Sequence, residues 1–203
     1  MKRGTLFLQV VAAAVLATAA GVLVWQGRPT APGETIATTR SGQPFRLASS
    51  AGGIVDSNDL AGEPYIVYFG FTNCPVICPT TLYELSNELA ALGSAGARLK
   101  VLFITVDPER DTPDFLATYL QGFDPRIIGL VPTEQQLAEI AKAFGIVYEK
   151  VPTSDGSYTM NHTATVFLID GAGRLLGTLA PDEGEAAKLA KLKRLVAGGG
   201  GNG

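Results

Sequence analysis

Residues 65–82 read YIVYFGFTNCPVICPTTL, and the way this stretch changes along its length decides the fold. Residues 65–71 form an apolar, aromatic run of strand length, and residues 80–92 carry apolar side chains at helical spacing. The loop between them holds Cys74 and Cys78, the two cysteines of the chain. The pattern therefore predicts a strand, a cysteine loop and a helix in direct succession.

The alternation of strand-like and helix-like segments continues beyond this stretch. We predict a strand at 99–106, a helix opened by Thr112 and Pro113, a strand at 127–131, a helix at 134–144, strands at 164–169 and 174–179, and a final helix from about 183 to 196. Capping boxes are predicted at Thr81 with Glu84 and at Thr133 with Gln136. Parallel strand–helix–strand units that lead into an antiparallel edge and a closing helix favour a thioredoxin-like α/β fold.

The N-terminus has the pattern of a transmembrane helix. Lys2 and Arg3 precede an uncharged, mostly apolar run at residues 5–25, which as a helix would span about 30 Å. Residues 17–19 read ATA and fit a signal-peptidase site, but apolar sequence resumes after them, which favours an uncleaved anchor. Because the positive charges precede the span, we expect the rest of the chain on the non-cytoplasmic, periplasmic side of the membrane.

The chain divides into four predicted parts. These are an anchor at 1–26, a linker at 27–34, one thioredoxin-like domain at 35–196 and a disordered glycine-rich tail at 197–203. The net charge is −3 with both signs interspersed, which excludes a nucleic-acid-binding surface. We expect the basic cluster of Lys188, Lys191, Lys193 and Arg194 near a helix C-terminus, where positive charge is favourable.

Cys74 and Cys78 can have three chemical roles. Their i, i+4 spacing brings both thiols within reach of a shared metal ion or of each other. A structural disulfide across so short a loop would stabilise the fold little. A catalytic dithiol needs a thiol of lowered pKa, yet residues 65–97 contain no basic side chain or histidine. A metal ion deprotonates its own thiol ligands, so a metal site needs no such neighbour and is the preferred role.

His162 is the one histidine of the chain and the candidate third ligand. In a thioredoxin-like topology, the loop that enters the strand at 164 faces the loop that leaves the first strand. Two soft sulfurs and an imidazole suit copper(I), whereas zinc would seek a fourth ligand. Asp107 ends the second strand at the same edge, and we keep it as a candidate for the rim of the site or for a contact with its ligands.

Three segments resemble the signatures of one known family. Residues 68–82 (YFGFTNCPVICPTTL), 106–113 (VDPERDTP) and 158–163 (YTMNHT) are similar to the three signatures of the Sco/SenC proteins, in order and at suitable spacing. The resemblance implies a thioredoxin-like domain on a single membrane anchor. It also implies a copper-binding protein that assists assembly of the binuclear copper centre of cytochrome c oxidase.

The resemblance implies specific ligands and partners as well. Carried over residue by residue, the ligands are Cys74, Cys78 and His162, which would hold one copper ion per domain, with copper(I) favoured. The implied partners are the oxidase subunit that carries the copper centre, other copper chaperones and thioredoxin-like reductants. The chain departs from the family at Val76, where many members have an acidic residue, and at Asn73, where many have a histidine or an aromatic residue.

A thiol–disulfide oxidoreductase or thiol peroxidase that uses Cys74 and Cys78 is the alternative function. Such thioredoxin-like enzymes usually have two residues between the cysteines and a proline opposite them. This chain has three spacer residues, and it has His162 and Thr163 where that proline is expected. We therefore expect a metal-binding protein rather than an enzyme, and an accessory thiol–disulfide reductase activity stays open.

Overall fold

The computed structural model describes residues 44–198 of the 203-residue chain. The predicted anchor at 1–26 and linker at 27–34 lie outside the described residues. Within residues 44–198, none of the helices has the length and apolar character needed to cross a membrane. The predicted tail lies outside as well, apart from Ala197 and Gly198, which the structure places in the last helix.

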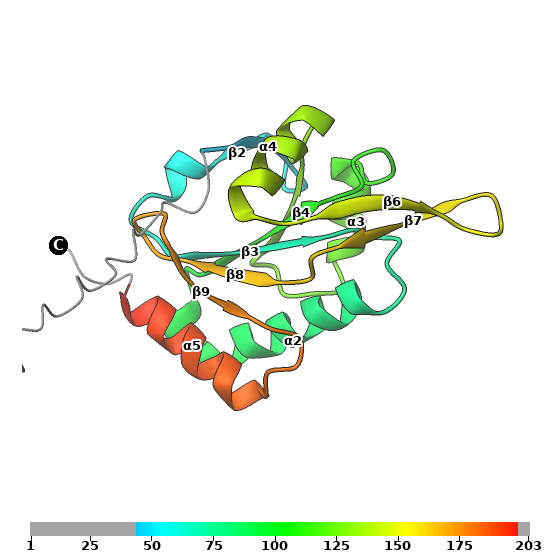
Figure 1. Cartoon of the computed structure of the whole chain (residues 1–203). Helices are drawn as coiled ribbons and strands as arrows, with labels where there is room; N and C mark the ends of the chain where they lie inside the picture. The colour runs from blue at the N-terminus through cyan, green and yellow to red at the C-terminus, as the bar shows by residue number, and fades with distance from the viewer. Residues whose placement is uncertain (1–43, 199–203) are drawn as a thin grey trace, which may run out of the picture. The chain divides into compact units, whose positions relative to one another are not determined.

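A mixed seven-stranded sheet forms the centre of the described fold, in the order β2-β1-β5-β4-β3-β8-β9 (Figure 1). The strands are β1 (Arg46–Ser49), β2 (Ile54–Asp56), β3 (Tyr65–Gly70), β4 (Lys100–Thr105), β5 (Ile127–Val131), β8 (Val166–Ile169) and β9 (Leu175–Leu179). β3, β4 and β5 are parallel, and every other pairing in this sheet is antiparallel. The mixed α/β, thioredoxin-like arrangement predicted from the sequence is confirmed.

Helices cover both faces of this sheet. They are α2 (Ile77–Leu92), α3 (Pro113–Leu120), α4 (Glu134–Phe144) and α5 (Glu185–Gly198), with short 3-10 turns η1 (Ser57–Leu60) and η2 (Gly93–Gly96). α4 lies on one face, and α2 and α5 lie on the other (Figure 1). Successive residues of a strand point to opposite faces, so Phe69 of β3 packs on Phe144 of α4, with ring centroids 5.3 Å apart. Its neighbour Tyr68 packs against Phe103 instead.

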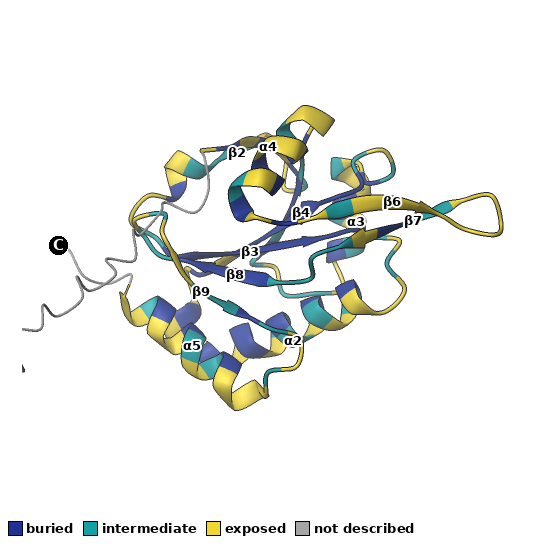
Figure 2. Cartoon of the chain, in the orientation of Figure 1, coloured by how far each residue is buried: buried dark blue, intermediate teal, exposed yellow. Residues whose placement is uncertain are grey.

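Strand β3 is buried on both faces along its whole length, as the dark central strands in Figure 2 show. This explains why residues 65–70 read as a continuous apolar run rather than as an alternation of apolar and polar residues. A strand covered on both sides is held rigidly by its neighbours. The cysteine loop, which follows β3 directly, therefore starts from a fixed point in the core.

The helix after the cysteine loop begins earlier than predicted. α2 starts at Ile77 with Val76 as its N-cap residue, so Thr81 lies inside the helix and the predicted capping box of Thr81 and Glu84 is wrong. The second capping box, of Thr133 and Gln136, is confirmed with both of its hydrogen bonds. α2 differs from the predicted helix because the chain is already helical at Cys78, shortly after it leaves β3.

Four strands of the described fold were not predicted from the sequence. β1 and β2 are short, and β6 (Tyr148–Pro152) and β7 (Tyr158–His162) form a separate two-stranded hairpin. Most residues of this hairpin are exposed or half-buried, so its sequence lacks the apolar run that marks a strand. The hairpin projects from the rest of the described fold (Figure 1), and its last residue is His162.

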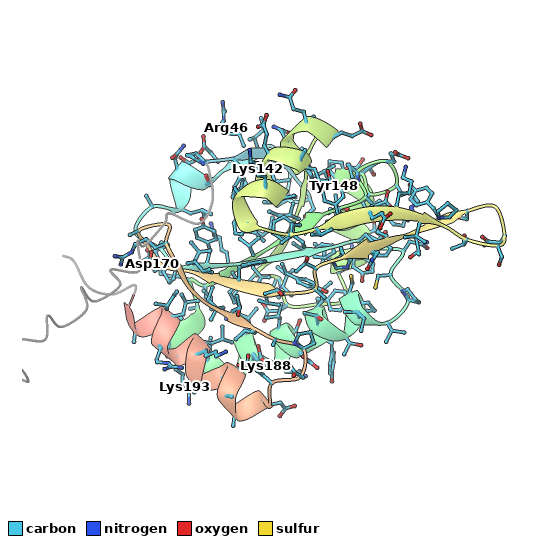
Figure 3. The ribbon with its side chains drawn as sticks, in the orientation of Figure 1. Arg46, Lys142, Tyr148, Asp170, Lys188 and Lys193 are labelled. Atoms are coloured by element: carbon cyan, nitrogen blue, oxygen red, sulfur yellow. The ribbon has the colours of Figure 1, made fainter. Side chains whose placement is uncertain are left out.

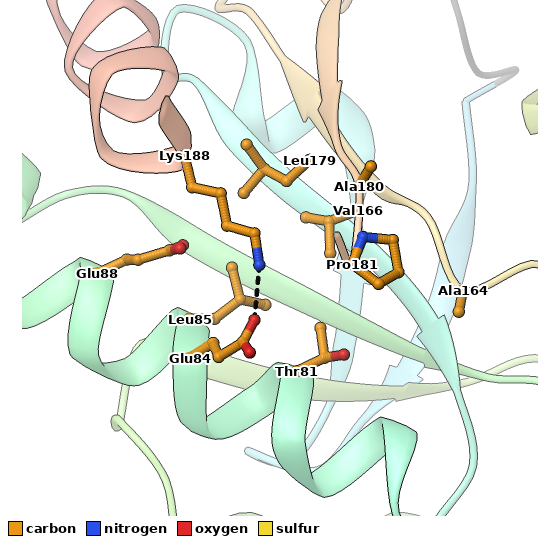
Figure 4. A pocket seen from close by; sticks show the side chains of 10 residues that line it. All are labelled: Thr81, Glu84, Leu85, Glu88, Ala164, Val166, Leu179, Ala180, Pro181 and Lys188. Carbon is orange, nitrogen blue, oxygen red and sulfur yellow. Dashed lines mark hydrogen bonds and ion pairs between the residues drawn. The ribbon is translucent and has the colours of Figure 1, made fainter. Parts of the chain in front are cut away.

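The prediction for the basic cluster is wrong at Lys188. The described part of α5 has no basic residue in its last turn. Lys188 is only 6% exposed, and its Nζ lies 2.7 Å from Oε2 of Glu84 on α2 (Figures 3 and 4). Lys191 pairs with Glu183 in the segment before the helix. The lysines fasten α5 to its surroundings, and this role depends on a helix-to-helix contact that no local pattern reveals.

Glu88 is buried on α2 beside this ion pair, and it should make the stability of the protein depend on pH. Burial raises its pKa from about 4.5 to about 7, while Lys188 opposes the shift. The folded protein thus keeps a proton that the unfolded chain has lost, so the free energy of unfolding should fall as the pH rises through this window. Glu88→Gln cannot ionise, and relative to the unmodified protein it should gain melting temperature at about pH 8 but not at about pH 4.

Thermal unfolding followed by circular dichroism at both pH values measures this difference. Glu84→Gln, which removes the half-exposed carboxylate of the same helix, is the matched control and should lose stability through the Lys188 pair instead. A melting-temperature difference for Glu88→Gln that is the same at both pH values would contradict the assignment.

Candidate metal centre

The sulfur of Cys74 sits at the N-terminus of α2. Val76, the N-cap residue, makes no side-chain hydrogen bond to the helix, and the backbone N–H of Cys78 instead donates to Cys74 Sγ at 3.4 Å. The first turn of a helix has unpaired N–H groups and a partial positive charge. The sulfur of Cys74 therefore faces the positive end of the helix.

Cys78 lies in the first turn of α2 and is fully buried. Its sulfur packs closely against the end of β3, because a Cβ at Gly70 would lie 3.0 Å from Cys78 Sγ and 2.5 Å from the ring of Phe103. Only glycine leaves room for the thiol at this point. Gly70 is thus a residue of the site that sequence reasoning missed, and its place directly before the cysteine loop was the available signal.

His162 brings its imidazole to Cys78 from the end of the hairpin. Its Nε2 lies 3.7 Å from Cys78 Sγ, although 84 residues separate the two in sequence. Its Nδ1 lies 3.1 Å from the carbonyl oxygen of Thr163. A carbonyl only accepts, so this contact assigns the ring proton to Nδ1 and leaves the lone pair of Nε2 facing the sulfur.

The ring of His162 is also fixed by packing and kept neutral by burial. Phe71 meets it edge to face, with ring centroids 5.7 Å apart. Burial lowers the pKa of His162, while the contact with the Thr163 carbonyl acts in the opposite direction. A neutral imidazole is the form that binds a metal ion. The environment therefore prepares Nε2 as a ligand.

The distance between sulfur and imidazole fits a shared metal ion. With bonds of about 2.3 Å to sulfur and about 2.0 Å to nitrogen, two ligands at an angle near 115° lie roughly 3.6 Å apart. Cys78 and His162 already lie close to this separation. Within residues 44–198, however, no three His, Cys, Asp or Glu side chains are grouped as closely as a metal site requires. Binding through all three donors would thus need the half-exposed Cys74 to turn toward the other two.

The two thiols differ in their environments. Both are free, Cys78 being buried and Cys74 partly exposed. Burial raises the pKa of the Cys78 thiol to about 12, and a hydrogen bond from the Phe71 backbone opposes the shift. Cys78 therefore carries a proton at neutral pH in the metal-free protein, and a metal ion must displace that proton when it binds.

Asp111 organises the cysteine loop and was missed by the sequence analysis. It is fully buried, and its carboxylate accepts hydrogen bonds from Thr72 Oγ1 at 2.5 Å, from the Thr72 backbone N–H at 3.1 Å and from Thr105 Oγ1 at 2.6 Å. The carboxylate thereby ties the loop that carries Cys74 to the end of β4. Aspartate is common in turns, so the sequence alone gave no reason to distinguish Asp111 from its neighbours.

Asp107 is buried beside the hairpin. It is 2% exposed, and its carboxylate pairs with Arg110 and accepts a hydrogen bond from Tyr158 Oη at 2.9 Å. Among the described residues, neither cysteine nor His162 hydrogen-bonds to it. Tyr158 begins the strand that His162 ends, so its hydrogen bond links Asp107 to the hairpin side of the site.

The fold and the site define a thioredoxin-like domain with two thiols in and after the loop that leaves β3 and an imidazole brought beside the second thiol by the hairpin. The sequence profile of the SCO1/SenC family matches residues 33–197, which is most of the chain. The chain therefore belongs to the SCO1/SenC family, as its three signature segments predicted.

Relatives and solved structures agree with this membership. The SCO2-like protein RP587 of Rickettsia prowazekii is 38% identical over 137 residues, which cover 66% of this chain and 67% of the relative. The copper-bound structure of Bradyrhizobium japonicum ScoI has a TM-score of 0.70 at 40% identity and covers 76% of this chain and 98% of ScoI. Copper-bound yeast Sco1 has a TM-score of 0.70 at 33% identity and covers 77% of this chain and 88% of Sco1.

The unequal environments predict unequal reactivity of the two thiols. In the reduced, metal-free protein at about pH 8, iodoacetamide should modify Cys74 quickly and Cys78 slowly, since alkylation needs an accessible thiolate. Peptide mass spectrometry at increasing times measures both rates. Cys78→Ser should keep the fast reaction and Cys74→Ser should lose it, while equal rates for the two thiols would contradict the burial of Cys78.

Proposed function

We propose that this protein is a membrane-anchored copper chaperone that assists assembly of the binuclear copper centre of cytochrome c oxidase. In this proposal Cys74, Cys78 and His162 bind one copper ion, with copper(I) favoured. The protein would hold the ion as cargo and pass it to the oxidase subunit that carries the copper centre. Other copper chaperones and thioredoxin-like reductants are the further partners of this proposal.

The observation that carries the proposal is the approach of Cys78 Sγ and His162 Nε2 to 3.7 Å. Sulfur and imidazole donors at this separation suit a soft metal ion, and thiolate ligands select copper(I). Two homologues in the same family, from Bradyrhizobium japonicum and from yeast, have been solved with copper bound. Membership of the SCO1/SenC family supports the link to oxidase assembly.

The anchor and the orientation remain part of the proposal. The apolar run at residues 5–25 follows Lys2 and Arg3, so it would hold the domain on the periplasmic side. A tether confines the domain to the membrane that also contains its proposed target. Confinement raises the effective concentration of each partner for the other.

The alternative, a thiol–disulfide oxidoreductase or thiol peroxidase, has less support. A dithiol enzyme needs a thiol that ionises near neutral pH, and the pKa of Cys78 is raised to about 12. It also has no use for an imidazole aimed at the second sulfur. Cys74, beside the helix N-terminus, is the thiol through which an accessory reductase activity would act.

His162→Ala separates copper delivery from thiol chemistry. In cells that depend on this chain for oxidase assembly, the variant should give low oxidase activity at limiting copper, because one ligand is lost. Added copper should restore part of the activity, since mass action offsets a weaker site. Thiol–disulfide exchange by the purified variant should continue at a rate similar to that of the unmodified protein, because exchange requires thiolates and no imidazole.

Cys74→Ser is the matched control. It should lose both oxidase assembly and thiol–disulfide exchange, and added copper should not restore either. Normal oxidase activity of His162→Ala at limiting copper, together with failure of Cys74→Ser, would decide for the reductase function and against copper delivery.

A further inference from the structure

The hairpin that carries His162 has no backbone hydrogen bonds to the central sheet. β6 and β7 pair only with each other in the described fold, while the other strands join one continuous seven-stranded sheet. Apart from the chain connections to α4 and β8, the position of His162 therefore depends on side-chain contacts between the hairpin and the α/β domain. The residues of β7 show which contacts these are.

Tyr158, Met160 and His162 share one face of β7, because alternate residues of a strand point the same way. Met160 is buried, whereas Asn161, which points the other way, is exposed, so the face with Met160 is directed toward the domain. Tyr158 begins the strand and His162 ends it. A contact that fixes Tyr158 thus fixes the end of the strand opposite the imidazole, and with it the direction in which that imidazole points.

Asp107, Arg110 and Tyr158 are central to this contact, and an ion pair between Glu109 and Lys150 of β6 lies beside them. Tyr158 Oη donates to Asp107 Oδ1 at 2.9 Å, and Asp107 pairs with Arg110. Arg110 Nη1 donates to the backbone carbonyl of Tyr158 at 2.9 Å, and its guanidinium carbon lies 3.8 Å from the centre of the Tyr158 ring. Arg110 thereby holds both the backbone and the side chain of the strand, which a lysine in its place could not do.

The segment that supplies these residues also holds the cysteine loop. Asp107 and Arg110 contact the hairpin, while Asp111 binds Thr72, two residues before Cys74. One five-residue stretch, 107–111, is therefore bonded to both halves of the metal centre. It sets the distance between the loop that carries the thiols and the strand that carries the imidazole.

We propose that Asp107, Arg110 and Tyr158 form a clamp that positions His162 as a metal ligand, and this proposal rests on the copper-binding function proposed above. Without the clamp the hairpin would swing more freely and Nε2 would leave the sulfur of Cys78. The loss should fall mainly on copper(II), which prefers nitrogen ligands, because the two thiolates alone retain copper(I).

Tyr158→Phe tests the clamp by removing one oxygen atom and keeping the ring. We expect a copper(II) affinity about tenfold lower, as is typical when a group that orients a ligand is lost, and a smaller change for copper(I). In the electron paramagnetic resonance spectrum of the copper(II) protein, the coupling to nitrogen should weaken. Arg110→Lys, which keeps the charge but loses the two-ended contact, should have the same effect.

Tyr148→Phe is the matched control. Tyr148 lies on β6 directly opposite His162 in the strand register, yet its hydroxyl makes no hydrogen bond to any described residue. This variant should leave both copper affinities unchanged. In the His162→Ala background, Tyr158→Phe should cause no further loss of copper(II) affinity, because the residue on which the clamp acts is gone.

Hydrogen exchange of the full-length, copper-free protein gives a readout that needs no metal. Tyr158→Phe should speed exchange at residues 148–162 and leave the core strand β3 protected. Exchange like that of Tyr148→Phe, an unchanged copper(II) affinity, or a loss that persists in the His162→Ala background would each overturn the clamp. Failure of the unmodified protein to bind copper would instead overturn the proposed function, and with it the role of the clamp at a metal site.

Discussion

The proposed metal centre depends on the contact between Cys78 Sγ and His162 Nε2, two atoms 3.7 Å apart that belong to different sheets of the fold. Cys78 is fixed by the buried end of β3 and by the first turn of α2, where Gly70 leaves room for its sulfur. His162 belongs to a hairpin outside the main sheet. The geometry of the site is therefore decided by how firmly that hairpin is held to the rigid core.

Two buried carboxylates on the segment 107–111 hold the hairpin and the cysteine loop to the core. Asp111 receives three hydrogen bonds from neutral groups and fixes the approach to Cys74. Asp107 forms an ion pair with Arg110 and accepts a hydrogen bond from the hydroxyl of Tyr158. Burying a carboxylate is costly unless its oxygens are hydrogen-bonded, and both of these are. The same bonds that satisfy the charges join the thiol half of the site to its imidazole half.

The sequence predicted those parts of the fold that local patterns control. β3, β4, β5 and α4 were found because buried parallel strands and a capped amphipathic helix leave clear periodicities, and the two cysteines with His162 followed from residue chemistry. The hairpin was missed because its residues are largely exposed. The role of Asp111 and the position of Lys188 were missed because each depends on contacts between elements distant in sequence. The start of α2 was misplaced because no side-chain cap marks it.

X-ray absorption spectroscopy of the copper(I)-loaded protein tests the ligand set most directly. The account predicts one copper ion with two sulfur neighbours and one nitrogen neighbour, and in His162→Ala the nitrogen should disappear while both sulfurs remain. A third sulfur neighbour would have to come from a methionine or from a second copy, because the chain has two cysteines. A spectrum of the unmodified protein without nitrogen, or one unchanged by His162→Ala, would show that the imidazole does not bind the metal and would contradict the account at its centre.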